Sequence, residues 1–128
     1  MTPSEYVSNA IRTESPNFSL NYSTEEDTPN RMIRILHGAL GCVTEAGELA
    51  DTVKETLYYG KQFDRTNAVE EIGDIMWYTA ILCSALNVSL EEVMQRNIDK
   101  LRQRYPEKFT NDKANNRDLE AERKVLER

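Results

Sequence analysis

The chain has 128 residues, 30% of them charged, and its 22 acidic against 16 basic residues give a formal net charge of −6 at pH 7. The length favours a single domain, and the acidity argues against nucleic acid or an anionic membrane as a partner. Because the sequence has no apolar run of the ~18 residues that a membrane span needs, and because its polar N-terminus is unlike a signal peptide, we expect a soluble, cytoplasmic protein.

The first predicted elements are a short helix, a loop and a long helix. A capping-box spacing over Thr2–Glu5, with proline at the first helical position, predicts a helix to about Arg12. Residues 14–28 show no hydrophobic period, and we expect them to form a loop. Thr28 and Pro29 then start a long second helix, which ends at a connector over residues 59–65.

Two further helices and a charged tail are predicted after this connector. The third helix covers residues 66–86, with Asn87 as its C-cap. A second capping-box spacing over Ser89–Glu92 starts a fourth helix, which stops before Pro106. Residues 115–127 form a charged segment with helical propensity.

Each of the three central helices carries apolar residues at helical spacing, and we expect these to form its buried face. In the second helix they are Met32, Ile35, Ala39, Val43, Ala46, Ala50, Val53 and Leu57. In the third they are Ile72, Ile75, Met76, Thr79, Leu82, Cys83 and Leu86. In the fourth they are Leu90, Met94, Ile98, Leu101 and Tyr105.

Two acidic pairs border these apolar positions. Glu45 and Glu48 are three residues apart, as are Glu71 and Asp74, so each pair shares one face of its helix. Two unit charges ~5 Å apart repel by roughly 3 kcal/mol at an effective dielectric of ~20. If the two helices pack antiparallel, four converging carboxylates need a hard divalent cation with oxygen ligands. The alternative is that either pair is an ordinary acidic surface in contact with water.

The connector is long enough for the two pairs to meet. At ~1.5 Å per residue, the helical path is ~19 Å from the first pair to the connector and ~10 Å from the connector to the second pair. The connector must make up the ~9 Å difference, and seven extended residues reach roughly 23 Å. Convergence of the four carboxylates is therefore feasible.

The type of ligand predicts the metal and its substrate. A di-iron bundle would use Glu-x-x-His pairs, and His37 is not placed to form one, whereas carboxylate-only ligation favours Mg²⁺ or Mn²⁺. Mg²⁺ usually completes its shell with water and substrate phosphates. An anionic substrate also needs polar and cationic contacts, which Asn97, Lys100 and Arg104 on one flank of the fourth helix could supply. Salt bridges with acidic neighbours are the alternative role for this flank.

Two glycines, Gly38 and Gly41, lie on the acidic face of the second helix. Glycine costs about 1 kcal/mol in a helix interior, so we expect something to approach the backbone closely there. The sequence does not distinguish between a ligand and a tightly packed neighbouring helix as the group that approaches the backbone.

Four stretches of the chain resemble the MazG-type nucleotide pyrophosphohydrolases of the all-α NTP pyrophosphatase superfamily. They are Gly41-x-x-x-Glu-Ala-Gly-Glu-Leu49, Tyr59-Gly-Lys61, Glu70-Glu-Ile-Gly-Asp-Ile-Met-Trp-Tyr78 and Asn97-Ile-Asp-Lys-Leu-x-x-Arg-Tyr-Pro106. The resemblance runs from about residue 33 to 110. Its hallmark is the pairing of Glu-x-x-Glu with Glu-x-x-Asp across a variable spacer.

The resemblance implies an all-α fold, a four- to five-helix bundle completed by oligomerisation into a homodimer or homotetramer. It implies one domain over residues 1–128, with a core at about 29–106 and a helical tail at about 115–127. The implied reaction is Mg²⁺-dependent hydrolysis of a (deoxy)nucleoside triphosphate between its α- and β-phosphates, for nucleotide-pool control or house-cleaning. A hydrolase of another pyrophosphate ester, such as phosphoribosyl-ATP or an alarmone, is an alternative. So is a catalytically inactive helical interaction protein.

The resemblance also implies roles for single residues. The metal ligands and catalytic residues are the two acidic pairs, Glu45, Glu48, Glu71 and Asp74. The substrate phosphates are contacted by Asn97 and Lys100, with Lys61 and Arg104 as helpers. For His37 and Tyr78, contact with the nucleobase and packing within the protein are both open. Lys54 lies on the opposite side of its helix from Glu45, so it could reach a phosphate only in a neighbouring subunit.

Overall fold

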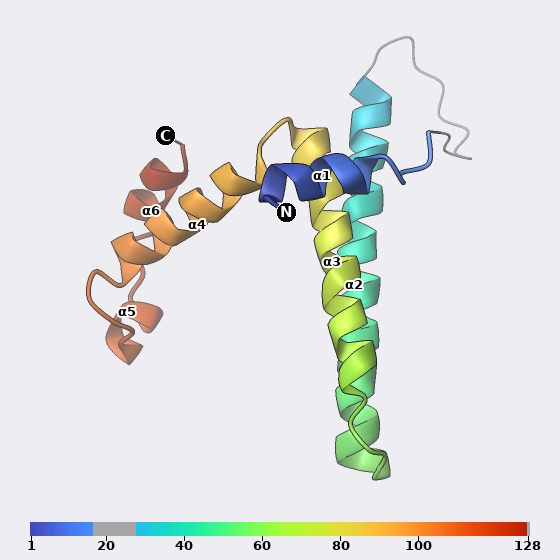
Figure 1. Cartoon of the computed structure of the whole chain (residues 1–128). Coiled ribbons are helices and arrows are strands. Elements are labelled where there is room, and N and C mark those ends of the chain that lie inside the picture. Colours follow the sequence, from blue (N-terminus) through green and yellow to red (C-terminus); the bar gives the residue numbers. More distant parts are fainter. Residues whose placement is uncertain (17–27, 128) are drawn as a thin grey trace. The chain divides into compact units, whose positions relative to one another are not determined.

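The computed structural model describes residues 1–16 and 28–127, and within these ranges the protein has six helices and no strand (Figure 1). The helices are α1 (Pro3–Ile11), α2 (Thr28–Tyr59), α3 (Arg65–Leu86), α4 (Leu90–Arg104), α5 (Asn111–Asn115) and α6 (Leu119–Leu126). The predicted all-α class is confirmed. The count exceeds the expected four to five because a five-residue helix, α5, precedes the charged tail. Most of the predicted loop over 14–28 lies outside the described residues.

The chain forms two compact units, Met1–Val88 and Ser89–Arg128. The first contains α1 to α3 and the second contains α4 to α6. The expectation of a single domain over residues 1–128 stays a prediction. In the described part of the chain, no helix combines the length and the apolar character that a membrane crossing requires.

Local sequence signals fix the helix ends. Thr2 caps α1 through a complete capping box with Glu5. Gly60, with φ of +69°, adopts the left-handed conformation that favours glycine and follows the last residue of α2. Asn87, with φ of +53°, ends α3, and the Ser89 hydroxyl caps α4 by accepting a bond from the Glu92 amide. The caps predicted at Thr2, Asn87 and Ser89 are confirmed.

Helices α2 and α3 form an antiparallel hairpin in the first unit (Figure 1). The face of α2 that meets α3 contains Gly38 and Gly41, which are both buried. A Cβ added to Gly38 would lie 2.7 Å from the Leu82 side chain, and one added to Gly41 would lie 2.2 Å from the Tyr78 ring. The tight-packing explanation for these glycines is therefore confirmed.

The predicted buried face of α2 is wrong for the single chain. Val43 is 70% exposed and Leu57 is 72% exposed, and most of the remaining stripe is also exposed. The helix turns its glycines toward α3 because they allow the closest approach of the two backbones. Hydrophobic periodicity located an apolar stripe on α2, but this stripe does not face α3 and is exposed in the single chain.

The predicted buried faces of α3 and α4 are only partly correct. In α3, Cys83 is buried and Ile75, Thr79 and Leu82 are half-buried, whereas Ile72, Met76 and Leu86 are exposed. The buried residues of α3 are mainly small, since α3 contacts both α1 and α2; they are Ala68, Glu71, Ala80, Ile81, Cys83 and Ala85. In α4, Leu90, Leu101 and Tyr105 are half-buried, whereas Met94 and Ile98 are exposed.

Three polar contacts fasten the N-terminal segment to the hairpin. The Tyr6 hydroxyl donates to the Gly73 carbonyl at 3.3 Å. The Trp77 indole N–H donates to the Thr13 hydroxyl at 2.7 Å. Farther along, Arg34 donates two bonds to Glu14, at 2.8 and 2.6 Å, and one to Ser84. These contacts place α1 against α3 (Figure 1).

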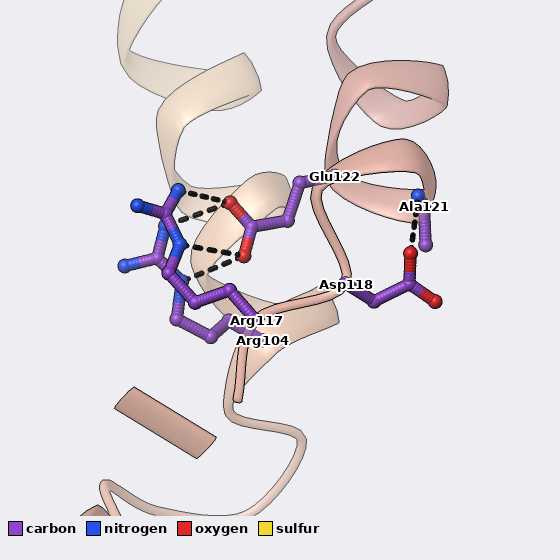
Figure 2. Close-up of polar contacts among 5 residues, drawn as sticks. All are labelled: Arg104, Arg117, Asp118, Ala121 and Glu122. Atoms are coloured by element: carbon purple, nitrogen blue, oxygen red, sulfur yellow. Dashed lines mark hydrogen bonds and ion pairs between the residues drawn. The ribbon is translucent and has the colours of Figure 1, made fainter. Parts of the chain in front are cut away.

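The second unit is held together by the carboxylate of Glu122 on α6, which is only 4% exposed. Figure 2 shows this carboxylate facing two guanidinium groups. Arg104 donates to its two oxygens at 2.8 and 2.7 Å, and Arg117 donates to them at 3.3 and 2.6 Å. Mainly because of the bonds from Arg104 and then Arg117, the pKa of Glu122 lies well below its usual range.

Candidate metal centre

Three carboxylates from two helices meet in the first unit. Glu45 comes from α2, and Glu71 and Asp74 come from successive turns of α3. Each offers an oxygen atom, and the three oxygens all lie within 4.8 Å of one another. Glu71 is 4% exposed, Glu45 is half-buried and Asp74 is exposed. The group therefore has a buried end, formed by Glu71, and an end open to solvent.

Glu48, the fourth predicted ligand, lies outside this three-carboxylate group. It is exposed on α2, one turn beyond Glu45, and its charge acts on Glu45. The hairpin thus brings together three of the four predicted ligands, and the fourth lies beside them.

The three carboxylates repel one another electrostatically. Partial burial raises the pKa of Glu45, and the charge of Glu48, a hydrogen bond with Glu71 and the charges of Asp74 and Glu71 raise it further. The donor set consists of carboxylate oxygens, which suit a hard divalent cation such as Mg²⁺ or Mn²⁺. A bound cation would remove the repulsion that the fold creates, so these residues fit such an ion.

A chain of hydrogen bonds supports the buried end of the group. The Asn67 side-chain amide donates to Glu71 Oε1 at 2.6 Å, and the Thr52 hydroxyl donates to Asn67 Oδ1 at 2.5 Å. No role was predicted for either residue from the sequence. The available signal was spacing: Asn67 precedes Glu71 by one turn of α3, and Thr52 follows Glu48 by one turn of α2.

Tyr6 is a further neighbour that the sequence analysis missed. Burial raises the pKa of the Tyr6 hydroxyl and the charge of Asp74 raises it further, so α1 lies within electrostatic reach of the group. No pattern in the short first helix pointed to this placement, because the contact joins residues 67 positions apart.

The predicted nucleobase contacts, His37 and Tyr78, lie in an aromatic cluster with Trp77. The His37 ring is 5.5 Å from the Tyr78 ring and 6.4 Å from the Trp77 ring, both in edge-to-face geometry. Tyr78 also packs on Gly41, and burial followed by the charges of Glu45 and Asp74 raises its pKa. Both side chains are half-buried. Their packing roles are visible here, and their roles in base recognition stay predictions.

The predicted phosphate contacts lie farther along the chain. Lys61 follows α2 and pairs with Glu55 at 2.6 Å. Asn97 and Lys100 are on α4, where Asn97 is exposed and Lys100 is half-buried. Arg104 is bound by Glu122, which is the salt-bridge arrangement considered as the alternative. The substrate roles of these four residues stay predictions.

Comparison with known proteins identifies the family. The sequence profile of the MazG nucleotide pyrophosphohydrolase domain matches residues 37–109. Since this match covers more than half of the chain, the protein belongs to the MazG nucleotide pyrophosphohydrolase family. It is also similar to the Gene 37 protein of Mycobacterium phage L5, with 44% identity over 69 residues. That match spans 51% of this chain and 60% of the relative, less than two thirds of its length. No solved structure gives a significant match.

Proposed function

We propose that the protein is a divalent-metal-dependent pyrophosphohydrolase of nucleoside triphosphates. It would cleave a ribo- or deoxynucleotide between the α- and β-phosphates, giving the monophosphate and pyrophosphate, for nucleotide-pool control. The observation that carries this proposal is the meeting of Glu45, Glu71 and Asp74 oxygens within 4.8 Å, in a chain of the MazG family.

The three-carboxylate group would hold Mg²⁺ or Mn²⁺, with Glu48 as a fourth acidic side chain beside it. When bound, the metal neutralises charge on the phosphate oxygens and lowers the pKa of a bound water. Glu48 lies outside the group and is exposed. We therefore assign to it the orientation of the attacking water.

The proposed reaction also needs contacts to the phosphates and to the base of the substrate. Asn97 and Lys100 would bind the phosphates, with Lys61 and Arg104 as helpers. Lys100 is a half-buried cation of α4. His37 and Tyr78 would contact the base through the edges of the aromatic cluster.

A second copy of the chain would complete the fold. The predicted buried face of α2 is exposed in the single chain, and the exposed Leu36 and Leu40 widen it on neighbouring positions. Large apolar side chains gathered on one helix face favour association. We propose that the protein is a homodimer or homotetramer built on α2 and α3.

The deciding experiment is a panel of ribo- and deoxynucleoside triphosphates with Mg²⁺, in which pyrophosphate and orthophosphate are both measured. Pyrophosphate as the primary product, lost in excess EDTA, supports the proposal. Orthophosphate as the primary product rejects it, because cleavage would then be at the terminal phosphate. The panel also contains phosphoribosyl-ATP and an alarmone. Exclusive hydrolysis of either compound would identify the protein as a hydrolase of that other pyrophosphate ester. No hydrolysis of any compound would identify it as a catalytically inactive interaction protein.

Two variants assign the activity to the site. Asp74→Asn removes an anionic ligand at nearly constant volume and should reduce turnover by orders of magnitude, with partial recovery at high Mg²⁺. Asp51→Asn is the matched control, because Asp51 is an exposed residue of α2 that pairs with Lys54. Equal activity in the two variants would rule out a metal role for Asp74.

A further inference from the structure

The buried carboxylate of Glu71 needs neighbouring groups that fix its orientation. The terminal torsion of a glutamate side chain is broad, so an unsupported carboxylate would sample many directions. A buried charge also requires hydrogen-bond partners. Asn67 provides one of them at 2.6 Å on Oε1.

The chemistry of the contact fixes the orientation of the Asn67 amide. An ionised carboxylate only accepts hydrogen bonds, so the amide nitrogen must face Glu71. The amide oxygen then points away, and the Thr52 hydroxyl meets it at 2.5 Å. The Thr52 hydroxyl also lies 3.2 Å from the Glu48 carbonyl of its own helix, so the contact with Asn67 is the closer of the two.

The backbone holds both residues in place. The Asp64 side chain caps α3 by accepting a bond from the Asn67 amide N–H at 3.0 Å, which sets Asn67 in the first turn of the helix. Thr52 is an interior residue of α2. The Thr52–Asn67 bond therefore joins the two helices that supply the carboxylates, next to the point where they converge.

We propose that Thr52 and Asn67 are positioning residues that orient Glu71 for cation binding. A neutral amide suits this role because it binds the ionised carboxylate without adding a positive charge that would repel the metal. An aspartate at position 67 would instead place a negative charge against Glu71 and remove the donor. This inference rests on the proposed metal-dependent function and extends it to two residues outside the ligand set.

The test measures Mn²⁺ binding to the full chain by titration calorimetry, with no substrate present. Asn67→Ala should weaken Mn²⁺ binding by about 10- to 100-fold, the usual effect of removing a group that orients a metal ligand. Thr52→Val should weaken it less, and Thr52→Ser, which keeps the hydroxyl, should bind like the wild type. Thr56→Val is the matched control, because among the described residues the Thr56 hydroxyl bonds only the Thr52 carbonyl.

A double variant separates orientation from a general loss of structure. If Thr52 acts through Asn67, adding Thr52→Val to Asn67→Ala should cause no further loss of affinity. Circular dichroism in EDTA confirms that each variant is folded. Wild-type Mn²⁺ affinity in Asn67→Ala, together with lost binding in Glu71→Gln, would overturn this inference and leave the proposed function standing. A wild-type protein that binds no Mn²⁺ would overturn both.

Discussion

At the residue scale, the Tyr78 ring packs directly against Gly41 in the hairpin. Replacing Gly41 with alanine would put a Cβ 2.2 Å from that ring. Overpacking of this kind typically costs about 1–3 kcal/mol, which outweighs the gain of up to about 1 kcal/mol in helix propensity. We expect Gly41→Ala to lower the free energy of unfolding, measured by urea denaturation in EDTA.

Gly47 offers the matched control for this substitution. It lies in the same helix, but a Cβ there would meet nothing within 4 Å. Gly47→Ala should therefore keep or raise stability by up to about 1 kcal/mol. Equal stability of the two alanine variants would show that the Tyr78 ring moves aside freely.

The raised pKa of Glu45 predicts how the metal-free protein responds to pH. The folded state holds the Glu45 proton more tightly than the unfolded chain, whose pKa is about 4.3. As pH rises through this value and the higher folded-state pKa, the folded state binds more protons than the unfolded one, so the free energy of unfolding falls. Above the folded-state pKa, the contribution of Glu45 to the free energy of unfolding no longer changes with pH.

Thermal melting in EDTA between pH 4 and 7 measures this effect as the difference between wild type and Glu45→Gln. Groups whose titration Glu45 does not influence cancel in this difference, and Glu122, whose lowered pKa acts in the opposite direction, is among them. The difference therefore reports Glu45 together with the carboxylates that interact with it. We expect the wild type to lose stability relative to the variant as pH rises. Saturating Mn²⁺ should reverse the trend, because the cation favours the ionised carboxylate. A pH-independent difference in EDTA would contradict this account of Glu45.

At the scale of elements, Glu122 joins α6 to α4 through Arg104. Glu122→Gln removes the negative charge between two guanidinium groups and leaves both cations unneutralised. We expect faster hydrogen exchange in the amides of α6. Because the pKa of Glu122 is lowered in the fold, its stabilisation is present above the ordinary glutamate pKa and is lost as pH falls.

Glu120→Gln is the control for this prediction. Glu120 is exposed on the same helix and pairs with Lys124 across one turn, a surface contact of small energetic effect. Unchanged α6 protection in Glu122→Gln would mean that the apolar contacts of α6 suffice to hold it.

At the scale of the whole molecule, the proposed assembly makes the exposed apolar face of α2 testable. In an isolated chain, Val43→Asp would be a surface change worth less than about 0.5 kcal/mol. Within an interface it would bury an unpaired charge. We expect the wild type to sediment as a dimer or tetramer and Val43→Asp to sediment as a monomer of reduced activity.

Leu119→Asp is the control, because Leu119 is equally apolar and 63% exposed but lies on α6, outside the proposed interface. It should leave sedimentation unchanged. A fully active wild-type monomer at micromolar concentration would refute the proposed assembly.

The parts of the fold that could be predicted are those that local chemistry decides. The ends of α1, α3 and α4 follow from capping residues such as Thr2, Asn87 and Ser89, which act on their nearest turns. The convergence of acidic groups followed from helix rise and connector length. The partner of each face could not be predicted, because an apolar stripe looks the same whether α3 or another molecule covers it.

The candidate site shows the same division. The meeting of Glu45, Glu71 and Asp74 could be predicted because the connector lets the two acidic pairs converge, and converging carboxylates repel one another unless a cation is bound. The position of Glu48 beside this group could not be predicted, because it depends on how α2 is rotated against α3. The roles of Asn67 and Thr52 could not be predicted because a single amide or hydroxyl in a helix has no distinctive pattern. The role of Arg104 stayed open because its partner, Glu122, is 18 positions away.

The contacts of α1 have a consequence for how the chain folds as it leaves the ribosome. Tyr6 and Thr13 precede their partners Gly73 and Trp77 by 67 and 64 positions. At about 5–20 residues per second, roughly 3–13 s of translation separates the two sides of these contacts. A helix of nine residues is marginal in water by itself. The α2–α3 hairpin therefore closes first, and α1, although synthesised earlier, docks onto it afterwards.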